Sequence, residues 1–112
     1  MNTHHEKAVI EVLITTQLQA LQRKDVNAAV ENYHLDVRIF DVVGPLSHHG
    51  RSAVKTRLTE WLSGFRSVTV VSAKLEVEAD NTIGYSNCFN HVMGELEDGS
   101  MLDMFWRETL CW

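Results

Sequence analysis

The spacing of the apolar residues changes partway along this 112-residue chain, and that change constrains the fold more than any other feature. Before Arg66, apolar side chains recur three and four residues apart, which is the spacing of amphipathic helices. After Arg66 they alternate with polar side chains, most clearly between Val71 and Ala79. Such alternation is typical of an antiparallel strand with one face in water. Helices followed by strands predict an α+β fold, and the length fits a single domain over residues 1–112.

Three helices are expected before Arg66. The first covers residues 3 to about 23 and opens with a capping-box pattern, T-H-H-E. Asp25 is the expected N-cap of a second, short helix that ends near residue 33. The third begins at residue 51 or 52 and ends at Gly64.

Strands account for most of the remaining residues. A short strand at 37–41 precedes a turn at Gly44-Pro45 and an extended piece that ends at Gly50. Three long strands follow, at residues 66–79, 83–95 and 101–112. Alternation predicts which side chains of a strand share a face. On the second long strand, one face carries Ile83, Tyr85, Asn87, Phe89, His91 and Met93. On the third, one face carries Met101, Asp103, Phe105, Arg107 and Thr109, and the opposite face carries Leu102, Met104, Trp106, Leu110 and Trp112.

Charge and motif content exclude several classes of partner. The net charge is −5 at pH 7 and no basic run is present, which argues against nucleic acid and anionic membranes as partners. No segment is apolar enough to span a bilayer or to serve as a signal peptide, so a cytoplasmic location is expected. Cys88 and Cys111 form no C-x-x-C pattern, and neither adjacent histidine pair has chelating spacing. Neither a metal nor a cofactor is therefore expected.

Asp41 and Asp103 are the candidate catalytic residues, because each carboxylate interrupts an otherwise apolar strand. An ionised acid in that setting is costly unless it is hydrogen-bonded or open to a wet cavity. Burial raises the pKa of a carboxyl group, and unequal surroundings can leave one acid protonated and another ionised. Such a pair can move a proton beside a carbonyl group. The alternatives are that Asp41 only caps the Gly44-Pro45 turn and that Asp103 is solvated on an edge strand.

Further polar residues are candidates for binding a ligand. Gln17 shares the apolar face of the first helix, so its amide points into a cavity or lies at the edge of that face in water. His91, with Asn87, would orient a ligand or relay a proton, or would serve as hydrogen-bonded scaffold. Arg107 lies about 13 Å along the strand from Asp103, so it would bind an acidic ligand or bridge another carboxylate. The full set of candidate lining residues is Gln17, Tyr33, Trp61, Asn87, His91, Phe105 and Arg107.

The order and spacing of these segments resemble the nuclear transport factor 2-like superfamily, and within it the SnoaL-like and ketosteroid isomerase-like proteins. The resemblance rests on residues 20–33, 39–46, Gly50, the strand pair around Asp98-Gly99, and D-M-F-W-R-E-T at 103–109. It implies a cone-like fold in which three helices pack on a curved, mainly antiparallel sheet. It also implies that Asp41 corresponds to the general base, Asp103 to a protonated acid, and Gln17 to the family's oxyanion-hole tyrosine.

The resulting functional hypothesis is a small protein whose partly apolar pocket binds a hydrophobic small molecule. If the protein is an enzyme, the expected reaction is isomerisation, cyclisation or dehydration next to a carbonyl group without a cofactor, with Asp41 as base and Asp103 as acid. The alternative is a non-catalytic ligand-binding or assembly module, since one fold hosts both.

A homo-oligomer is also expected. SnoaL-like proteins usually continue into one more strand after the segment that corresponds to residues 103–109, whereas this sequence stops at Trp112. An open sheet edge is normally covered. The edge of the last strand and the apolar Trp106–Trp112 face are therefore expected to be buried in a dimer or tetramer.

Overall fold

The helices and strands follow the order that the sequence predicts. The structure, a computed structural model, describes residues 3–41 and 45–112. Its elements are α1 (Thr3–Gln22), α2 (Val26–Val30), β1 (Arg38–Phe40), β2 (Ser47–His49), α3 (Arg51–Ser63), β3 (Phe65–Ala79), β4 (Gly84–Leu96) and β5 (Met101–Cys111). The predicted α+β class is confirmed. The predicted turn residue Gly44 lies outside the described residues, together with Val42 and Val43.

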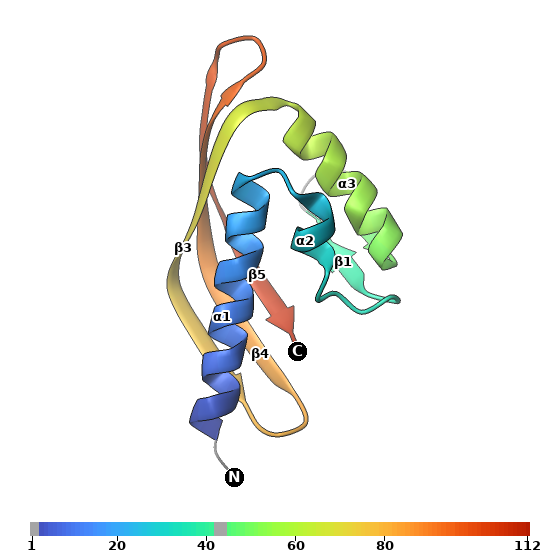
Figure 1. Cartoon of the computed structure of the whole chain (residues 1–112), viewed down its shortest axis with the longest axis vertical. Helices are drawn as coiled ribbons and strands as arrows, with labels where there is room; N and C mark the ends of the chain where they lie inside the picture. The colour runs from blue at the N-terminus through green and yellow to red at the C-terminus, as the bar shows by residue number, and fades with distance from the viewer. Residues whose placement is uncertain (1–2, 42–44) are drawn as a thin grey trace.

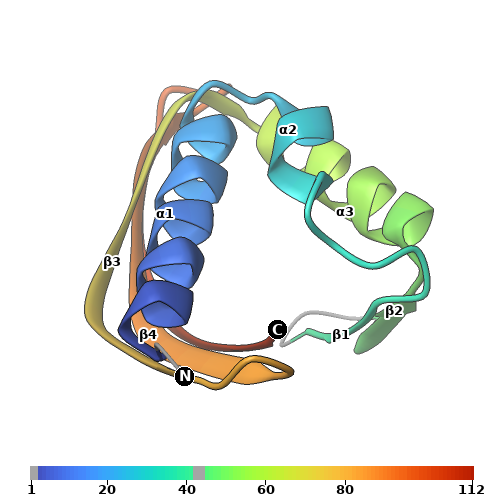
Figure 2. The same cartoon turned by 60° about the horizontal axis from the view of Figure 1, so that its bottom comes forward.

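Two antiparallel sheets organise the molecule. β3, β4 and β5 form a three-stranded sheet in that order, and β1 pairs with β2. Figure 1 shows the long sheet curving around α1. Figure 2 shows α3, β1 and β2 on the side opposite β3, with α1 against the sheet and α2 connecting the two sides. This arrangement is the cone-like fold that the resemblance implies.

The core lies between α1 and the inner face of the long sheet, the face toward the helices. In the main cluster, Ala20 and Leu21 of α1 pack with Val70 of β3 and Val92 of β4. A second cluster brings Ile10 and Ile14 of α1 to Val77 of β3, among other contacts. The apolar stripe of α1 thus covers β3 and the adjoining part of β4, as its helical spacing predicts.

The predicted helix ends are accurate where a cap defines them. The Asp25 Oδ1 atom accepts a hydrogen bond from the backbone N–H of Ala28 at 3.1 Å, so Asp25 is the N-cap of α2. α3 begins at Arg51, and Gly64 is its C-cap. α2 is shorter than predicted and ends at Val30, after which the chain turns.

A β-bulge in β3 changes which side chains face the core. The pairing between β3 and β4 shifts register between Ala73 and Glu76, and Lys74 has a φ of 53°. The extra residue reverses the alternation. The expectation of one continuous apolar face from Val71 to Ala79 is therefore wrong: Val70 and Val77 are buried, whereas Val71 is 44% exposed on the outer face.

The face of β4 that carries its large apolar residues is not the face that packs against the core. Its buried side chains are Ser86, Cys88, Asn90 and Val92. Because side chains alternate, the set that runs from Tyr85 to Met93 lies on the outer face. On β5 the inner face holds Leu102, Trp106 and Leu110, which pack against the two core clusters.

The Trp106–Trp112 face contacts its own chain in part, and the expectation that it and the edge of the last strand are buried in an oligomer stays a prediction. Trp106 packs on the main cluster, and Trp112 packs on the second. The Trp112 Nε1–H also donates to Ser86 Oγ at 3.0 Å. This face is turned toward its own chain. Among the described residues, no helix is both long enough and apolar enough to cross a membrane.

We expect Gly94→Ala to destabilise the fold. A Cβ atom at Gly94 would lie 2.6 Å from Phe65 Cδ1 and 2.7 Å from the Ser67 carbonyl oxygen. Phe65 is 1% exposed and cannot move aside, so the loss should be about 1–3 kcal/mol in the free energy of unfolding, measured with urea. Gly64→Ala is the matched control, because its Cβ would meet only the Trp61 carbonyl oxygen at 3.5 Å. Equal stability of the two variants would contradict the packing described here.

Candidate functional site

Glu108 is a carboxyl group on the inner face of β5. It lies between Trp106 and Leu110 on that face and pairs across the sheet with Cys88. Burial raises the pKa of Glu108, and a hydrogen bond from the Asn90 side chain opposes this shift in part. Desolvation thus favours the protonated acid over a wider pH range than in water.

Tyr33 and Gln17 bring two further polar groups to the same region. The Gln17 Nε2–H donates to Tyr33 Oη at 2.6 Å, which joins α1 to the segment after α2. Burial raises the pKa of Tyr33 to about 12; the negative charge of Glu108 adds to this shift, and the Gln17 hydrogen bond opposes it. Tyr33 therefore keeps its proton at neutral pH and is a hydrogen-bond donor there.

Cys88 and Asn90 complete this group on β4. The Cys88 Sγ–H donates to Asn90 Oδ1 at 3.4 Å. Burial, followed by the charge of Glu108, raises the pKa of the Cys88 thiol to about 11. The thiol is thus protonated at neutral pH and is not a nucleophile, since the thiolate is the reactive form. We refer to Gln17, Tyr33, Cys88, Asn90 and Glu108 as the inner cluster.

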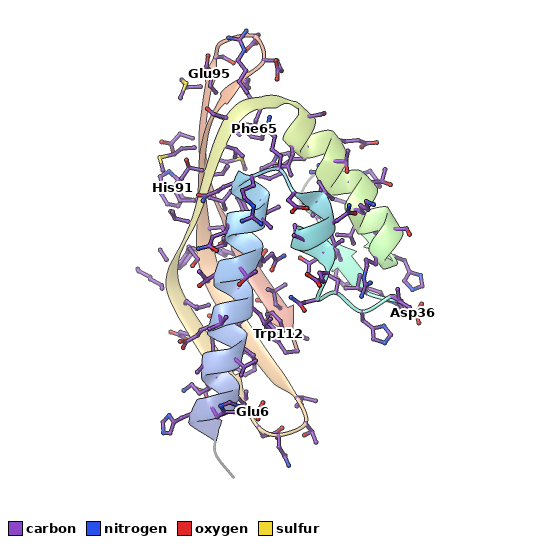
Figure 3. The ribbon with its side chains drawn as sticks, in the orientation of Figure 1. Glu6, Asp36, Phe65, His91, Glu95 and Trp112 are labelled. Carbon is purple, nitrogen blue, oxygen red and sulfur yellow. The ribbon has the colours of Figure 1, made fainter. Side chains whose placement is uncertain are left out.

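All three tryptophans of the chain belong to the same side of the sheet. Trp61 of α3 meets Trp106 edge-on, with ring centroids 6.1 Å apart. Trp106 is the neighbour of Asn90 across the sheet. Trp112 lies farther along the inner face, near the C-terminus (Figure 3). Because all three rings are only partly buried, they provide an apolar surface beside the inner cluster.

Asp41 belongs to a second polar group, at the end of β1. The Arg57 Nε–H of α3 donates to Asp41 Oδ2 at 3.1 Å, and His48 Nε2 lies 3.9 Å from the same oxygen. The Asp41 N–H donates to the Leu46 carbonyl oxygen at 2.6 Å, which ties Asp41 to the residues beyond the turn. His48 Nε2 is buried and has no hydrogen-bond partner within the part of the chain that the structure describes.

Asp103 lies on the outer face, where it bonds to His91. The Asp103 Oδ1 and His91 Nε2 atoms are 2.7 Å apart, and the Asp103 side chain is 66% exposed. The His91 ring stacks on Phe105 with centroids 4.0 Å apart. Figure 3 shows His91 on the side of the sheet away from the helices. The structure therefore does not bring Asp41 and Asp103 together, and the expected pair of facing carboxylates is corrected.

Strand alternation divides the candidate ligand-binding residues into two groups. Gln17, Tyr33 and Trp61 lie on the inner side, where a shared site was expected. Asn87, His91, Phe105 and Arg107 lie on the outer face and cannot line the same site. Sequence reasoning missed Glu108. Its signal was a charged residue between Trp106 and Leu110 on the apolar face of the last strand.

Within residues 3–41 and 45–112, no group of three or more His, Cys, Asp or Glu side chains is placed to hold a metal ion.

Comparison with solved structures identifies the fold. A nuclear transport factor 2-like protein of unknown function from Pseudomonas putida aligns with a TM-score of 0.86 and 22% identity, over 97% of this chain and 76% of that one. A candidate dehydratase of the same family from Streptomyces avermitilis gives 0.81 and 11%, over 96% and 84%. A candidate scytalone dehydratase from Novosphingobium aromaticivorans gives 0.79 and 14%, over 93% and 72%. No protein-family model and no curated protein matches the sequence. The chain has the nuclear transport factor 2-like fold, which confirms the resemblance in fold.

We expect Glu108→Gln to stabilise the protein increasingly as the pH rises. With its folded-state pKa raised, Glu108 binds its proton more tightly in the folded chain than in the unfolded one. The stability that this proton contributes is complete below the unfolded pKa of about 4.3 and is lost as the pH rises through the folded pKa. The stability of the variant relative to wild type should therefore rise over this pH interval and then become constant. The total rise should be about 1.4 kcal/mol for each unit by which the folded-state pKa exceeds the unfolded one.

Urea unfolding between pH 4 and pH 8 measures this difference. Glu60→Gln is the matched control, because Glu60 is exposed on α3 and its substitution should change stability by a small, constant amount. A Glu108→Gln difference that does not vary with pH would show that Glu108 is not desolvated in the folded chain.

Proposed function

We propose that the inner face of the sheet binds a hydrophobic carbonyl compound, and that the inner cluster together with Asp41 catalyses acid–base chemistry on it without a cofactor. The reaction class is isomerisation, cyclisation or dehydration next to the carbonyl group. The observation that carries the proposal is the half-buried carboxyl group of Glu108, which lies between Trp106 and Leu110 on the inner face of β5 and whose pKa is raised by burial. Groups with shifted pKa values in a partly open apolar setting are characteristic of catalytic sites.

The tryptophans support a hydrophobic ligand. Trp61, Trp106 and Trp112 present partly exposed ring surface beside the inner cluster. Placing an apolar ring against these residues removes apolar area from water, worth about 25 cal/mol for each square ångström. The few polar groups nearby would then fix the orientation of the bound molecule, as in most small-molecule sites.

Glu108 and Tyr33 supply the chemistry in this proposal. A protonated carboxyl group and a phenol are both hydrogen-bond donors, and both stabilise negative charge that develops on a carbonyl oxygen when a neighbouring C–H proton is removed. Tyr33 suits this role because its pKa of about 12 keeps the donor proton in place. Gln17 donates to Tyr33 Oη and thereby fixes the phenol group. Glu108 takes over the acid role that the sequence assigns to Asp103.

Asp41 remains the proposed base. It follows β1, which Figure 2 shows on the side of the molecule opposite β3. Its carboxylate is held by Arg57 and stays partly exposed, at 20% of its side-chain area. A carboxylate fixed in this way needs little reorganisation before it accepts a proton.

Non-catalytic ligand binding is the second candidate function. The ion pair between Arg57 and Asp41 favours it, because the Asp41 Oδ2 atom already accepts a hydrogen bond from Arg57 and is less available to a substrate proton. Two of the similar solved structures are described as candidate dehydratases, and another is described as being of unknown function.

We expect the enolisable ketone 2-tetralone to bind more tightly than tetralin, which has the same ring system without the carbonyl group. One added hydrogen bond predicts a roughly 2- to 12-fold preference. Quenching of tryptophan fluorescence reports the binding directly, because all three tryptophans belong to the inner side. Tyr33→Phe should reduce the preference, whereas Tyr85→Phe, on the outer face, should not. Equal affinity of wild type for the two compounds would contradict the proposed carbonyl site.

We expect the protein to catalyse exchange of the α-protons of 2-tetralone with D₂O. Removing a general base or acid typically lowers a rate by about 10²- to 10⁴-fold, so Asp41→Asn and Glu108→Gln should each slow the exchange, followed by NMR. The Glu60→Gln variant serves as the control. Tight binding of 2-tetralone with no exchange above that of buffer would favour the non-catalytic function. Unchanged exchange in Asp41→Asn alone would remove Asp41 from the role of base.

A further inference from the structure

Arg57 has hydrogen-bond donors that the folded chain does not use. Its Nε–H donates to Asp41 Oδ2 at 3.1 Å, and within the described residues no hydrogen bond uses its Nη1 or Nη2 atoms. A guanidinium group carries five N–H donors, and its planar edge matches a carboxylate through two parallel hydrogen bonds. The Arg57 side chain is only 26% exposed, so the unused donors belong to a partly buried cation and are costly to leave without an acceptor.

The position of Arg57 on α3 brings these donors close to the tryptophans. Arg57 and Trp61 are one helical turn apart, about 6 Å along the axis, and side chains four residues apart share a face. Trp61 meets Trp106 edge-on, beside the inner cluster. A ring and a carboxylate joined by two or three carbon atoms span about the same distance. One ligand can therefore contact both the ring surface and Arg57.

The other cations of α3 are less suited to bind a ligand there. Arg51 donates through Nε and Nη2 to the Tyr33 carbonyl oxygen, so its donors are already used. Lys55 is exposed and lies two positions before Arg57, on a different side of the helix. The net charge of −5 opposes anions in general, so an anion must be attracted by a local group. On α3, Arg57 alone combines partial burial with unused donors.

His48 offers Asp41 a second donor. His48 Nε2 lies 3.9 Å from Asp41 Oδ2 and is buried without a hydrogen-bond partner in residues 3–41 and 45–112. If the two atoms moved about 1 Å closer, they would form a hydrogen bond in the tautomer that carries a proton on Nε2. Asp41 would then stay held on one side while Arg57 turns part of its planar edge toward a ligand.

We infer that Arg57 binds a carboxylate of the ligand, which makes the ligand of the inner face a hydrophobic oxo acid with an apolar ring, a carbonyl group and a carboxylate. The inference rests on the proposed function for the places of the ring and the carbonyl group. One guanidinium group then holds two carboxylates, that of Asp41 through Nε and that of the ligand through the Nη atoms. This arrangement brings the carboxylate end of the ligand close to the proposed base.

The affinity for 3-phenylpropanoate relative to 3-phenylpropanamide tests the inference on the full chain. The amide has the same ring and length without the charge. We expect wild type to prefer the carboxylate at least about tenfold, as one charge-assisted hydrogen bond predicts. Quenching of tryptophan fluorescence measures both affinities. Arg57→Gln should abolish the preference, whereas Lys55→Gln, which removes a positive charge from the exposed side of the same helix, should keep it.

A double variant separates direct contact from an effect through Asp41. Arg57→Gln also removes the cation that neutralises Asp41, and the remaining negative charge would by itself repel an anion. Asp41→Asn combined with Arg57→Gln removes both charges and should still show no preference, whereas Asp41→Asn alone should keep it. Circular dichroism and thermal unfolding establish that each variant is folded, and the double variant replaces Arg57→Gln if the latter is not.

Two results would overturn the inference. One is equal affinity of wild type for the two compounds, and the other is recovery of the preference in the double variant, which would show that Arg57 only neutralises Asp41. Neither compound contains a ketone, so the outcome is separate from that of the proposed function. An Arg57-dependent preference together with equal affinity for 2-tetralone and tetralin would retain the carboxylate site and remove the carbonyl chemistry. Selective binding of 2-tetralone without a carboxylate preference would do the reverse.

Discussion

The packing of α1 against β3 determines which inner side chains of the long sheet are buried and which stay partly exposed. A helix is about 10 Å across, and three strands side by side are wider than this. The apolar stripe of α1 covers β3 and part of β4, where Val70, Val77 and Val92 are buried. On β5 the inner side chains are only partly buried, because no second helix lies over the whole of that strand. Incomplete cover of β5 is thus a direct result of placing one long helix on the sheet.

Because the helices cover β5 only in part, Glu108 is partly desolvated and still partly accessible. A carboxyl group beneath α1 would be sealed from any ligand, and one on the outer face would be hydrated and titrate normally. On the inner face of β5, desolvation is sufficient to raise the pKa of Glu108 and that of Tyr33, while both residues stay partly accessible. The same property leaves ring surface exposed on the neighbouring tryptophans. The polar and apolar parts of the candidate site therefore have one common cause.

The sequence predicts helices more reliably than it predicts sheet faces, for a physical reason. A helical stripe has one apolar side, so Gln17 could be assigned to the apolar side of α1, where its amide donates to Tyr33. A strand of this protein has apolar side chains on both sides. On β4, Phe89 indicates one face as strongly as Val92 indicates the other, yet only Val92 is buried. On β3 the bulge at Lys74, an ordinary residue in a left-handed conformation, reverses the alternation without any glycine to signal it.

The error over Asp103 follows from the same limit. A short motif such as D-M-F identifies a segment of the family, but the function of its acid depends on which face of the strand it occupies. Asp103 and Glu108 are separated by an odd number of positions on one strand, so they must lie on opposite faces. The inner face then receives Glu108 with Trp106 and Leu110, and the outer face receives Asp103 with Phe105 and Arg107. One strand thus carries an acid suited to ligand chemistry on one side and an exposed set of apolar and charged side chains on the other. Because the two sets share only the backbone of β5, either face can change in sequence without altering the side-chain contacts of the other.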